Sequence, residues 1–154
     1  MTEALEARLQ VLEETSLALS ILPKYAAAVD SADLDAVLDL FADNGVLHSP
    51  RGDFAGRAAI AGFFRDAWAA DPSRKRHFVT NTQPRWISAG QVAIDAYFLY
   101  TGRSPADSVL GWGSYRAVVD VSAEPKFLDI AIGVEVGTTL TDGWADKNDQ
   151  EANR

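Results

Sequence analysis

The sequence predicts an α+β fold, a cone-shaped barrel in which a curved, mostly antiparallel sheet wraps around N-terminal helices. Before Pro72, apolar side chains recur at helical spacing. After it, four long segments rich in β-branched and aromatic residues are separated by short turns. Strands of this length must curl, and helices on one face of a curled sheet enclose a cavity. A chain of 154 residues has the size of one domain. We therefore expect a single domain over residues 1–140, followed by a polar, flexible C-terminal tail over residues 141–154.

Three helices are expected in the first part of the chain. Leucines recur near helical spacing as far as Leu22, and Pro23 can open a second helix as its first residue. Residues 30–33 (Asp-Ser-Ala-Asp) carry a helix-start signal, a short polar residue with an acid three positions later. The third helix has an apolar face that includes Phe41, and we expect it to end near Gly45.

A short strand, a turn and a fourth helix are expected next. Residues 45–49 form the strand and residues 50–53 the turn, and the following helix ends at Asp71, because proline disfavours the helical conformation of the residue before it. The rest of the chain is predicted to be antiparallel sheet. Its strands are expected at residues 76–87, 91–101, 108–121 and 126–136.

Composition argues against several classes of function. The formal net charge of −8 disfavours a duplex nucleic-acid partner, whose affinity depends on neutralising phosphates. The chain has no cysteine and only two histidines, His48 and His77, and these do not stand in a metal-binding motif. No apolar run reaches the roughly 18 residues that cross a bilayer, and the N-terminal residues do not resemble a signal peptide. We expect no metal, no cofactor, no nucleic-acid or membrane partner, and a cytoplasmic location.

Five segments, in this order, resemble the SnoaL-like family of the nuclear transport factor 2-like superfamily. They are residues 25–33 (YAAAVDSAD), 40–43 (LFAD), 54–60 (FAGRAAI), 76–81 (RHFVTN) and 113–116 (GSYR). The superfamily includes dehydratases, isomerases, cyclases, epoxide hydrolases and non-catalytic subunits, so the resemblance is more specific to a fold than to a reaction. The outer face of such a sheet needs covering, and the resemblance likewise implies a homodimer or homotrimer.

Asp30 and His77 resemble the Asp–His pair of one subgroup, which includes scytalone dehydratase, the bacterial bile-acid dehydratase and hexachlorocyclohexane dehydrochlorinase. These lyases remove a proton and expel a leaving group without a cofactor. Tyr25 stands where the bile-acid enzyme has a tyrosine. The resemblance therefore implies a catalytic set of Asp30, His77 and Tyr25.

The chemistry of these side chains is compatible with that role and also with a structural one. A carboxylate on one ring nitrogen of His77 would fix its tautomer and leave the other nitrogen free to abstract a proton. Alternatively, Asp30 is a helix N-cap, His77 is a strand histidine with satisfied hydrogen bonds, and Tyr25 belongs to the core.

The aromatic residues are numerous enough to line a pocket for an apolar, ring-shaped substrate. As substrate-binding residues we expect Phe64, Trp68, Tyr97 and Trp112, with Asn81 as an amide donor on the same strand as His77; each is also compatible with a structural role. Trp86 and Tyr115 add to the aromatic set. We interpret His48 as a turn residue rather than a second base.

The leading hypothesis is a cofactor-independent lyase of the dehydratase type, acting on a hydrophobic cyclic small molecule. One alternative is an isomerase or polyketide cyclase that uses the same site. Another is a non-catalytic module, either a small-molecule binder or a subunit resembling the β chain of ring-hydroxylating dioxygenases.

Overall fold

The computed structural model describes residues 1–143, which form four helices and six strands. The helices are α1 (Thr2–Leu19), α2 (Ile21–Asp30), α3 (Leu34–Asp39) and α4 (Gly56–Ala70). The strands are β1 (Phe41–Ser49), β2 (Gly52–Ala55), β3 (Arg74–Ser88), β4 (Gln91–Arg103), β5 (Ser108–Asp120) and β6 (Lys126–Thr139). The tail expected over residues 141–154 lies, from residue 144 onward, outside the described residues. No helix among the described residues is long and apolar enough to cross a membrane.

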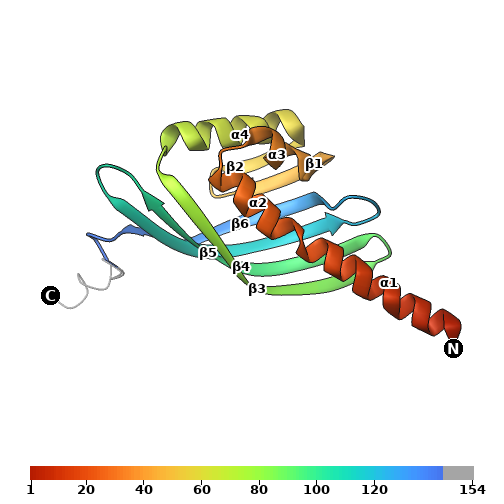
Figure 1. The fold of residues 1–154 in the computed structure, drawn as a ribbon. Coiled ribbons are helices and arrows are strands. Elements are labelled where there is room, and N and C mark those ends of the chain that lie inside the picture. Colours follow the sequence, from red (N-terminus) through yellow and green to blue (C-terminus); the bar gives the residue numbers. More distant parts are fainter. Residues whose placement is uncertain (144–154) are drawn as a thin grey trace.

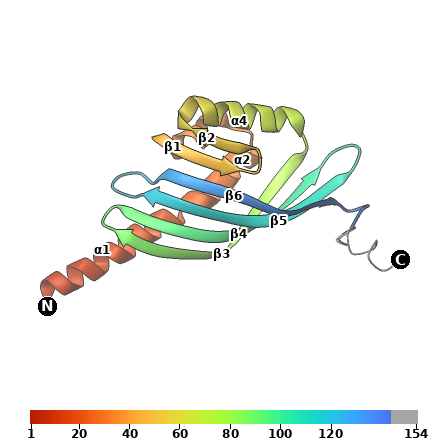
Figure 2. The ribbon, with the colours of Figure 1, turned by 180° about the vertical axis from the view of Figure 1, so that it is seen from behind.

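The strands form one sheet in the order β2-β1-β6-β5-β4-β3. β1 and β6 are parallel, and the other neighbouring strands are antiparallel. The sheet is strongly curved and the helices gather on its concave side, with α4 near β1 and β2 and with α1 and α2 crossing β3 (Figure 1). The same arrangement seen from behind shows that β2 and β3 are open edges (Figure 2). The α+β class is therefore confirmed, with a mixed sheet that curves without closing.

The core lies between the helices and the concave face of the sheet. Alternate residues of β4 point into it, from Val92 and Ile94 to Phe98, whereas Asp95 and Tyr97 between them are exposed. Full burial of one such apolar side chain contributes about 1.5–3 kcal/mol. The largest fully buried side chains come from both layers: Ile21, Leu22, Val37, Phe41, Leu47, Ile60, Val92, Ile94, Val119, Phe127 and Ile130.

The third helix is shorter than the sequence predicts. It ends at Asp39, and Phe41 begins β1 instead of completing the apolar face of the helix. Phe41 pairs with Phe127 of β6, and the two ring centroids lie 5.3 Å apart. The Phe127 N–H donates a hydrogen bond of 2.7 Å to the Leu40 carbonyl. Pairing with a strand far along the chain therefore overrides the local helical pattern. For this reason, such patterns are weak evidence for where a helix or strand ends.

The turn predicted at residues 50–53 is also displaced. The chain reverses around residues 50 and 51, and Gly52 and Asp53 already belong to β2, paired with Ser49 and His48 of β1. Gly52 has a φ of 127°, a conformation that favours glycine. The resulting hairpin brings Asp53 beside His48.

Candidate active site

Asp30 and His77 are in direct contact, although 47 positions separate them in the sequence. Oδ1 of Asp30 lies 2.6 Å from Nδ1 of His77, and Oδ2 accepts a hydrogen bond of 2.9 Å from the His77 backbone N–H. The side chains are only 8% and 13% exposed, respectively. The carboxylate thus holds both the main chain and the ring of the same histidine.

The break between α2 and α3 turns Asp30 towards the sheet. Asp30 is the last residue of α2, and the chain then reverses through Ala32, which has a φ of 51°. The N-cap of α3 is Asp33, whose side chain accepts from the Ala36 N–H at 3.0 Å. The helix-start signal therefore belongs to Asp33, and interpreting Asp30 as the cap is wrong.

The contact with Asp30 defines the tautomer of a neutral His77. Since an ionised carboxylate only accepts hydrogen bonds, Nδ1 carries the hydrogen and Nε2 has the free lone pair. Among the described residues, no hydrogen bond involves Nε2 of His77. The ring lies near those of Tyr100 and Phe98, with centroid distances of 5.7 and 6.2 Å. His77 therefore has the arrangement of an oriented base with an unused nitrogen.

His77 lines a cavity of about 260 Å³ between α2, α4 and the concave face of the sheet. Apolar side chains dominate the lining, including Val29, Ile132 and Val134. The cavity is large enough for a small ring system and has the apolar, aromatic walls typical of sites for such molecules. Its aromatic lining residues are Tyr25, Phe63, Phe64, Trp68, Phe98, Tyr100 and Tyr115.

Two tyrosine hydroxyls supply polar groups in this cavity. Tyr25 and Tyr115 are each 2% exposed, and the hydrogen bonds of the described residues include none from either hydroxyl. Burial raises the pKa of Tyr25 well above its usual value, and the neighbouring Tyr115 adds to the rise. Burial also raises the pKa of Tyr115, with a further contribution from the Asp30 carboxylate. Both phenols therefore stay protonated near neutral pH and can donate a hydrogen bond to a ligand.

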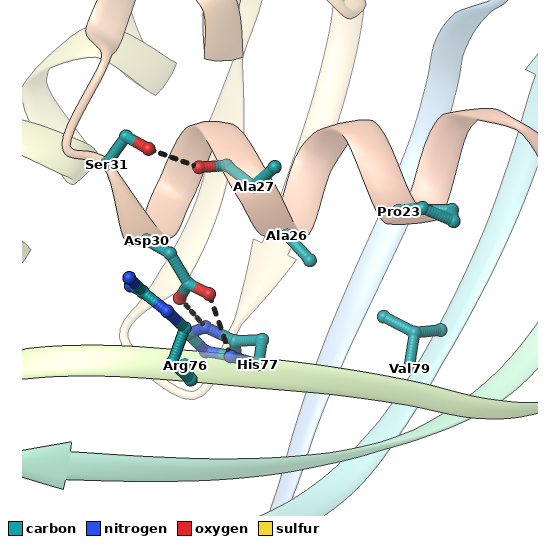
Figure 3. Close-up of a pocket in the computed structure, with 8 residues that line it drawn as sticks. All are labelled: Pro23, Ala26, Ala27, Asp30, Ser31, Arg76, His77 and Val79. Carbon is teal, nitrogen blue, oxygen red and sulfur yellow. Dashed lines mark hydrogen bonds and ion pairs between the residues drawn. The ribbon is translucent and has the colours of Figure 1, made fainter.

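A second groove of about 430 Å³ is lined by residues of α2 and β3, and Asp30 and His77 are among them. Figure 3 shows the Asp30 carboxylate pointing down from the end of α2 onto the His77 ring, with Pro23 and Ala26 of α2 facing Val79 of β3. His77 lines both this groove and the aromatic cavity. The histidine thus borders two spaces.

The structure brings together five of the residues expected from the sequence. Asp30 and His77 are in contact, and Tyr25, Phe64 and Trp68 line the same cavity as His77. The ring of Tyr25 packs edge-on against that of Phe64 at 6.2 Å, and Phe64 in turn contacts Trp68 at 5.4 Å.

Three expected residues are not brought to the cavity. Tyr97 is 58% exposed and shares the outer face of β4 with Asp95, because side chains alternate along a strand. Trp112 pairs with Leu99 on that same outer face. Asn81 is exposed at an irregularity of β3 and has a φ of 53°, so the alternation that places His77 and Val79 on the inner face is broken at this residue.

Sequence reasoning did not identify Phe98, Tyr100 and Lys75 as lining residues. A signal for the first two is present in the sequence, because Asp95 marks the outer face of its strand and the residues at odd spacing from it must face inward. Lys75 shares the inner face with His77, and its ammonium forms an ion pair of 2.6 Å with Asp71 at the cavity wall.

His48 is not a turn residue as expected but a member of β1 held by two carboxylates. Its Nδ1 lies 2.6 Å from Asp53 of β2, and its Nε2 lies 2.8 Å from Asp129 of β6. The hydrogen bond with Asp53 raises the pKa of His48, and that with Asp129 raises it further. Both ring nitrogens are occupied, so this histidine links three strands. Among the described residues, no group of three or more histidine, aspartate or glutamate side chains is arranged to hold a metal ion.

Known structures share this fold at low sequence identity. A hexachlorocyclohexane dehydrochlorinase from Novosphingobium barchaimii is 15% identical, with a TM-score of 0.78 over 90% of this chain and 98% of that one. A candidate scytalone dehydratase from Novosphingobium aromaticivorans is 16% identical, with a TM-score of 0.69 over 95% and 94% of the two chains. The β subunit of a candidate aromatic-ring-hydroxylating dioxygenase from the same organism is 14% identical, with a TM-score of 0.68 over 79% and 89%.

The sequence comparison gives the family. No curated protein matches the chain significantly. The profile of the SnoaL-like domain, in contrast, matches residues 23–122, which extend from the start of α2 to the end of β5 and include Tyr25, Asp30 and His77. Together with its nuclear transport factor 2-like fold, this match shows that the chain belongs to the SnoaL-like domain family.

Proposed function

We propose that the protein is a cofactor-independent lyase that eliminates water, or a comparable leaving group, from a hydrophobic cyclic small molecule. The observation that carries this proposal is the unused Nε2 of His77 in an aromatic cavity, with Nδ1 held by Asp30 at 2.6 Å. A buried imidazole oriented by a carboxylate is a good general base, and such catalysis contributes roughly 10²–10⁴-fold to a rate.

The proposed elimination uses three side chains of the cavity. Nε2 of His77 removes a proton from a carbon next to a carbonyl or an activating ring, and the C–H electrons form the new double bond as the C–O bond of the neighbouring carbon breaks. Asp30 stabilises the imidazolium that results. The imidazolium returns its proton to the departing oxygen, so that substrate gives alkene and water and His77 is regenerated.

Tyr25 and Tyr115 have a separate role in this scheme. Their hydroxyls donate to the oxygen on which negative charge develops, and they do so from a site that excludes most water. Because the pKa of each phenol is raised, neither acts as the base. In this scheme, His77 therefore abstracts the proton and the two tyrosines stabilise the negative charge.

The comparisons support this choice without deciding the substrate. Two of the proteins that share the fold carry the names of a dehydrochlorinase and a candidate scytalone dehydratase, both elimination activities. The test is to incubate the wild type, His77→Asn and Asp30→Asn with scytalone, hexachlorocyclohexane and hydroxylated cyclic ketones, followed by mass spectrometry. We expect a product lighter by water or hydrogen chloride, formed at least about 10²-fold more slowly by His77→Asn.

The same experiment separates the alternatives. An isomerase or cyclase with this site gives a product of unchanged mass that still depends on His77. A binding module, or a subunit like the dioxygenase β chain that shares the fold, gives ligand binding without any product and keeps its role in His77→Asn. We also propose a homodimer or homotrimer, which sedimentation would test directly.

A further inference from the structure

The aromatic cavity has a third tyrosine, Tyr100, that the proposed reaction does not use. It is the register partner of His77 on the neighbouring strand β4, and the two ring centroids lie 5.7 Å apart. Both side chains line the cavity. The hydrogen bonds of the described residues include none from the Tyr100 hydroxyl. A phenol that can both donate and accept therefore lies beside the proposed base with its hydrogen-bonding capacity unused.

Two glycines make room for the Tyr100 side chain. Gly111 of β5 is the register partner of Tyr100, and Gly137 of β6 is in turn the register partner of Gly111. A Cβ on Gly111 would overlap carbon atoms of the Tyr100 ring, and a Cβ on Gly137 would lie 3.1 Å from its hydroxyl oxygen. The ring thus extends from β4 across β5, and its hydroxyl reaches β6 on the concave face of the sheet.

Tyr100 and the two buried tyrosines lie at different ends of the cavity. Tyr115 pairs with Ala96 of β4, four residues before Tyr100. At about 3.3 Å per residue, these positions are roughly 13 Å apart along the strand. The ring of Phe98 lies between them, with its centroid 4.5 Å from that of Tyr115 and 6.3 Å from that of Tyr100. Tyr25 and Tyr115 are buried and Tyr100 is only partly buried, so Tyr100 marks the outer end.

Asp71 supplies a hydrogen-bond acceptor at this outer end, because it lines the same cavity. One of its oxygens accepts from the Ser73 N–H at 3.1 Å, and the other pairs with the Lys75 ammonium at 2.6 Å. A carboxylate has about four acceptor sites, so these contacts leave capacity for a ligand. Burial by itself would raise the pKa of Asp71, but the hydrogen bonds from Lys75 and Ser73 lower it below its usual value. Asp71 is therefore ionised near neutral pH.

Tyr100 and Asp71 are close neighbours without a direct contact. Burial raises the pKa of Tyr100 and the charge of Asp71 raises it further, so the phenol keeps its hydrogen. No hydrogen bond among the described residues joins the two side chains. The outer end of the cavity thus presents a donor and an acceptor that do not satisfy each other.

We infer that the outer end of the cavity, beside Tyr100 and Asp71, binds a hydroxyl group of the molecule whose apolar part occupies the cavity. A hydroxyl group accepts a hydrogen bond from Tyr100 and donates one to Asp71, whereas an ether or carbonyl oxygen satisfies Tyr100 alone. The negative charge of Asp71 disfavours a carboxylate at the same place. The match to both groups therefore selects a neutral hydroxyl.

This inference rests on the proposed function for the identity of the bound molecule as the substrate. In that reaction, Tyr25 and Tyr115 bind the oxygen on which negative charge develops. The substrate class is thereby narrowed from hydrophobic cyclic compounds to elongated cyclic ketones that carry a hydroxyl group at the end away from the carbonyl. Tyr100 is a specificity-determining residue for this class.

The test measures the binding of two probes, 4-phenylcyclohexanone and 4-(4-hydroxyphenyl)cyclohexanone, which differ by one hydroxyl at the end away from the carbonyl. By isothermal titration near neutral pH, we expect the wild type to bind the hydroxylated probe about 10-fold more tightly, the net effect of one or two hydrogen bonds. Tyr100→Phe removes only the hydroxyl, so it should reduce this preference to about 3-fold or less and bind 4-phenylcyclohexanone as the wild type does. Tyr97→Phe removes an exposed hydroxyl from the outer face of the same strand and should behave like the wild type.

Gly137→Ala is a second variant that retains the Tyr100 hydroxyl but moves it. The new methyl group would lie 3.1 Å from the hydroxyl oxygen, which must shift to make room. The preference for the hydroxylated probe should fall, while the affinity for 4-phenylcyclohexanone stays near that of the wild type. Thermal unfolding followed by circular dichroism checks the fold, and Tyr100→Phe should keep the wild-type Tm because no described hydrogen bond uses its hydroxyl.

Three results would overturn the inference. The first is that the wild type does not bind the hydroxylated probe more tightly, including the case in which it binds neither probe. The second is that Tyr100→Phe keeps the full preference, since the hydroxyl of the probe then lies elsewhere. The third is an equal loss of affinity for both probes in Tyr100→Phe, which would show that the Tyr100 hydroxyl does not distinguish them.

These outcomes are independent of catalysis, because the assay follows no reaction. Titration of His77→Asn with the same two probes should show the full preference for the hydroxylated one. If the preference depends on Tyr100 but no elimination is found, the proposed function fails and the hydroxyl site stands. If elimination depends on His77 but the two probes bind equally, the reverse holds.

Discussion

Replacing Asp30 by asparagine tests the central contact of the site. The carboxylate accepts from His77 twice, at Nδ1 and at the backbone N–H, with distances of 2.6 and 2.9 Å. Asparagine has one acceptor oxygen and an NH2 group in place of the second, so in the wild-type tautomer the Nδ1–H of His77 or the backbone N–H loses its acceptor. Because the two side chains are 8% and 13% exposed, water has little access to replace it. A buried donor without a partner costs about 1–3 kcal/mol, and we expect the free energy of unfolding to fall by this amount.

Urea unfolding, followed by tryptophan fluorescence, measures this loss. Asp33→Asn is the matched control, because it makes the same change of charge at an exposed N-cap where asparagine is as good as aspartate. Its free energy of unfolding should change by less than about 0.5 kcal/mol. If Asp30→Asn lowers the free energy of unfolding no more than Asp33→Asn does, the contact between Asp30 and His77 does not stabilise the fold. The argument that Asp30 orients His77 as a base is then refuted.

A second readout of Asp30→Asn reports the tautomer. Long-range ¹H–¹⁵N spectra above about pH 9, where an ordinary histidine is neutral, distinguish protonated from unprotonated ring nitrogens. In the wild type, His77 should have its hydrogen on Nδ1, and in Asp30→Asn the two tautomers should mix. His48→Gln assigns the signals, because the chain has only these two histidines. A wild-type His77 with its hydrogen on Nε2 would contradict the proposed role.

Three further predictions concern other parts of the molecule. His48 has a raised pKa because of Asp53 and Asp129, so its stabilising contribution is fully present below its ordinary value of 6.5 and is lost as the pH rises through the raised pKa. Asp53→Asn should therefore lower the Tm at about pH 5.5 more than at about pH 8.5, a small effect for an exposed pair; equal shifts would contradict it. In Gly113→Ala, the new Cβ would lie 1.9 Å from a backbone oxygen of β6, so this variant should unfold at a much lower temperature, whereas Gly62→Ala, with nothing within 4 Å, should not. Tyr25→Phe should keep the wild-type Tm, because no described hydrogen bond uses its hydroxyl, but should slow turnover; a lower Tm with unchanged turnover would assign the hydroxyl a structural role.

Periodicity predicted most of the fold because it reflects burial directly. The four long strands are where β-branched and aromatic segments predict them, and the helix over Gly56–Ala70 ends before Pro72 as expected. The predicted element bounds are wrong where the local structure depends on a residue that is distant in the sequence. The Leu40 carbonyl, just before Phe41, accepts a hydrogen bond from the Phe127 N–H, and nothing near Phe41 in the sequence indicates this contact. The start of β1 is therefore predicted as helix.

The candidate site was predictable in part for the same reason. Phe64 and Trp68 were selected for their aromatic character, and both line the cavity because they lie on one face of the regular helix α4. Tyr97 and Trp112 were selected for their aromatic character rather than for their position in the alternation of a strand, and they lie on the outer face. The expectation for Asn81 depended on unbroken alternation, which the irregularity in β3 removes.

The two histidines show why the residue type alone cannot define a base. Each lies on a strand beside an aspartate at 2.6 Å, so at the level of one contact they are alike. His48 has a second carboxylate, that of Asp129, on its other nitrogen, and both of its nitrogens are therefore occupied in linking strands. The second nitrogen of His77 has no such partner among the described residues, and the ring borders an apolar cavity. A lone pair that the fold leaves unused is available for chemistry, and this difference, created by contacts far apart in the sequence, assigns the proposed reaction to His77.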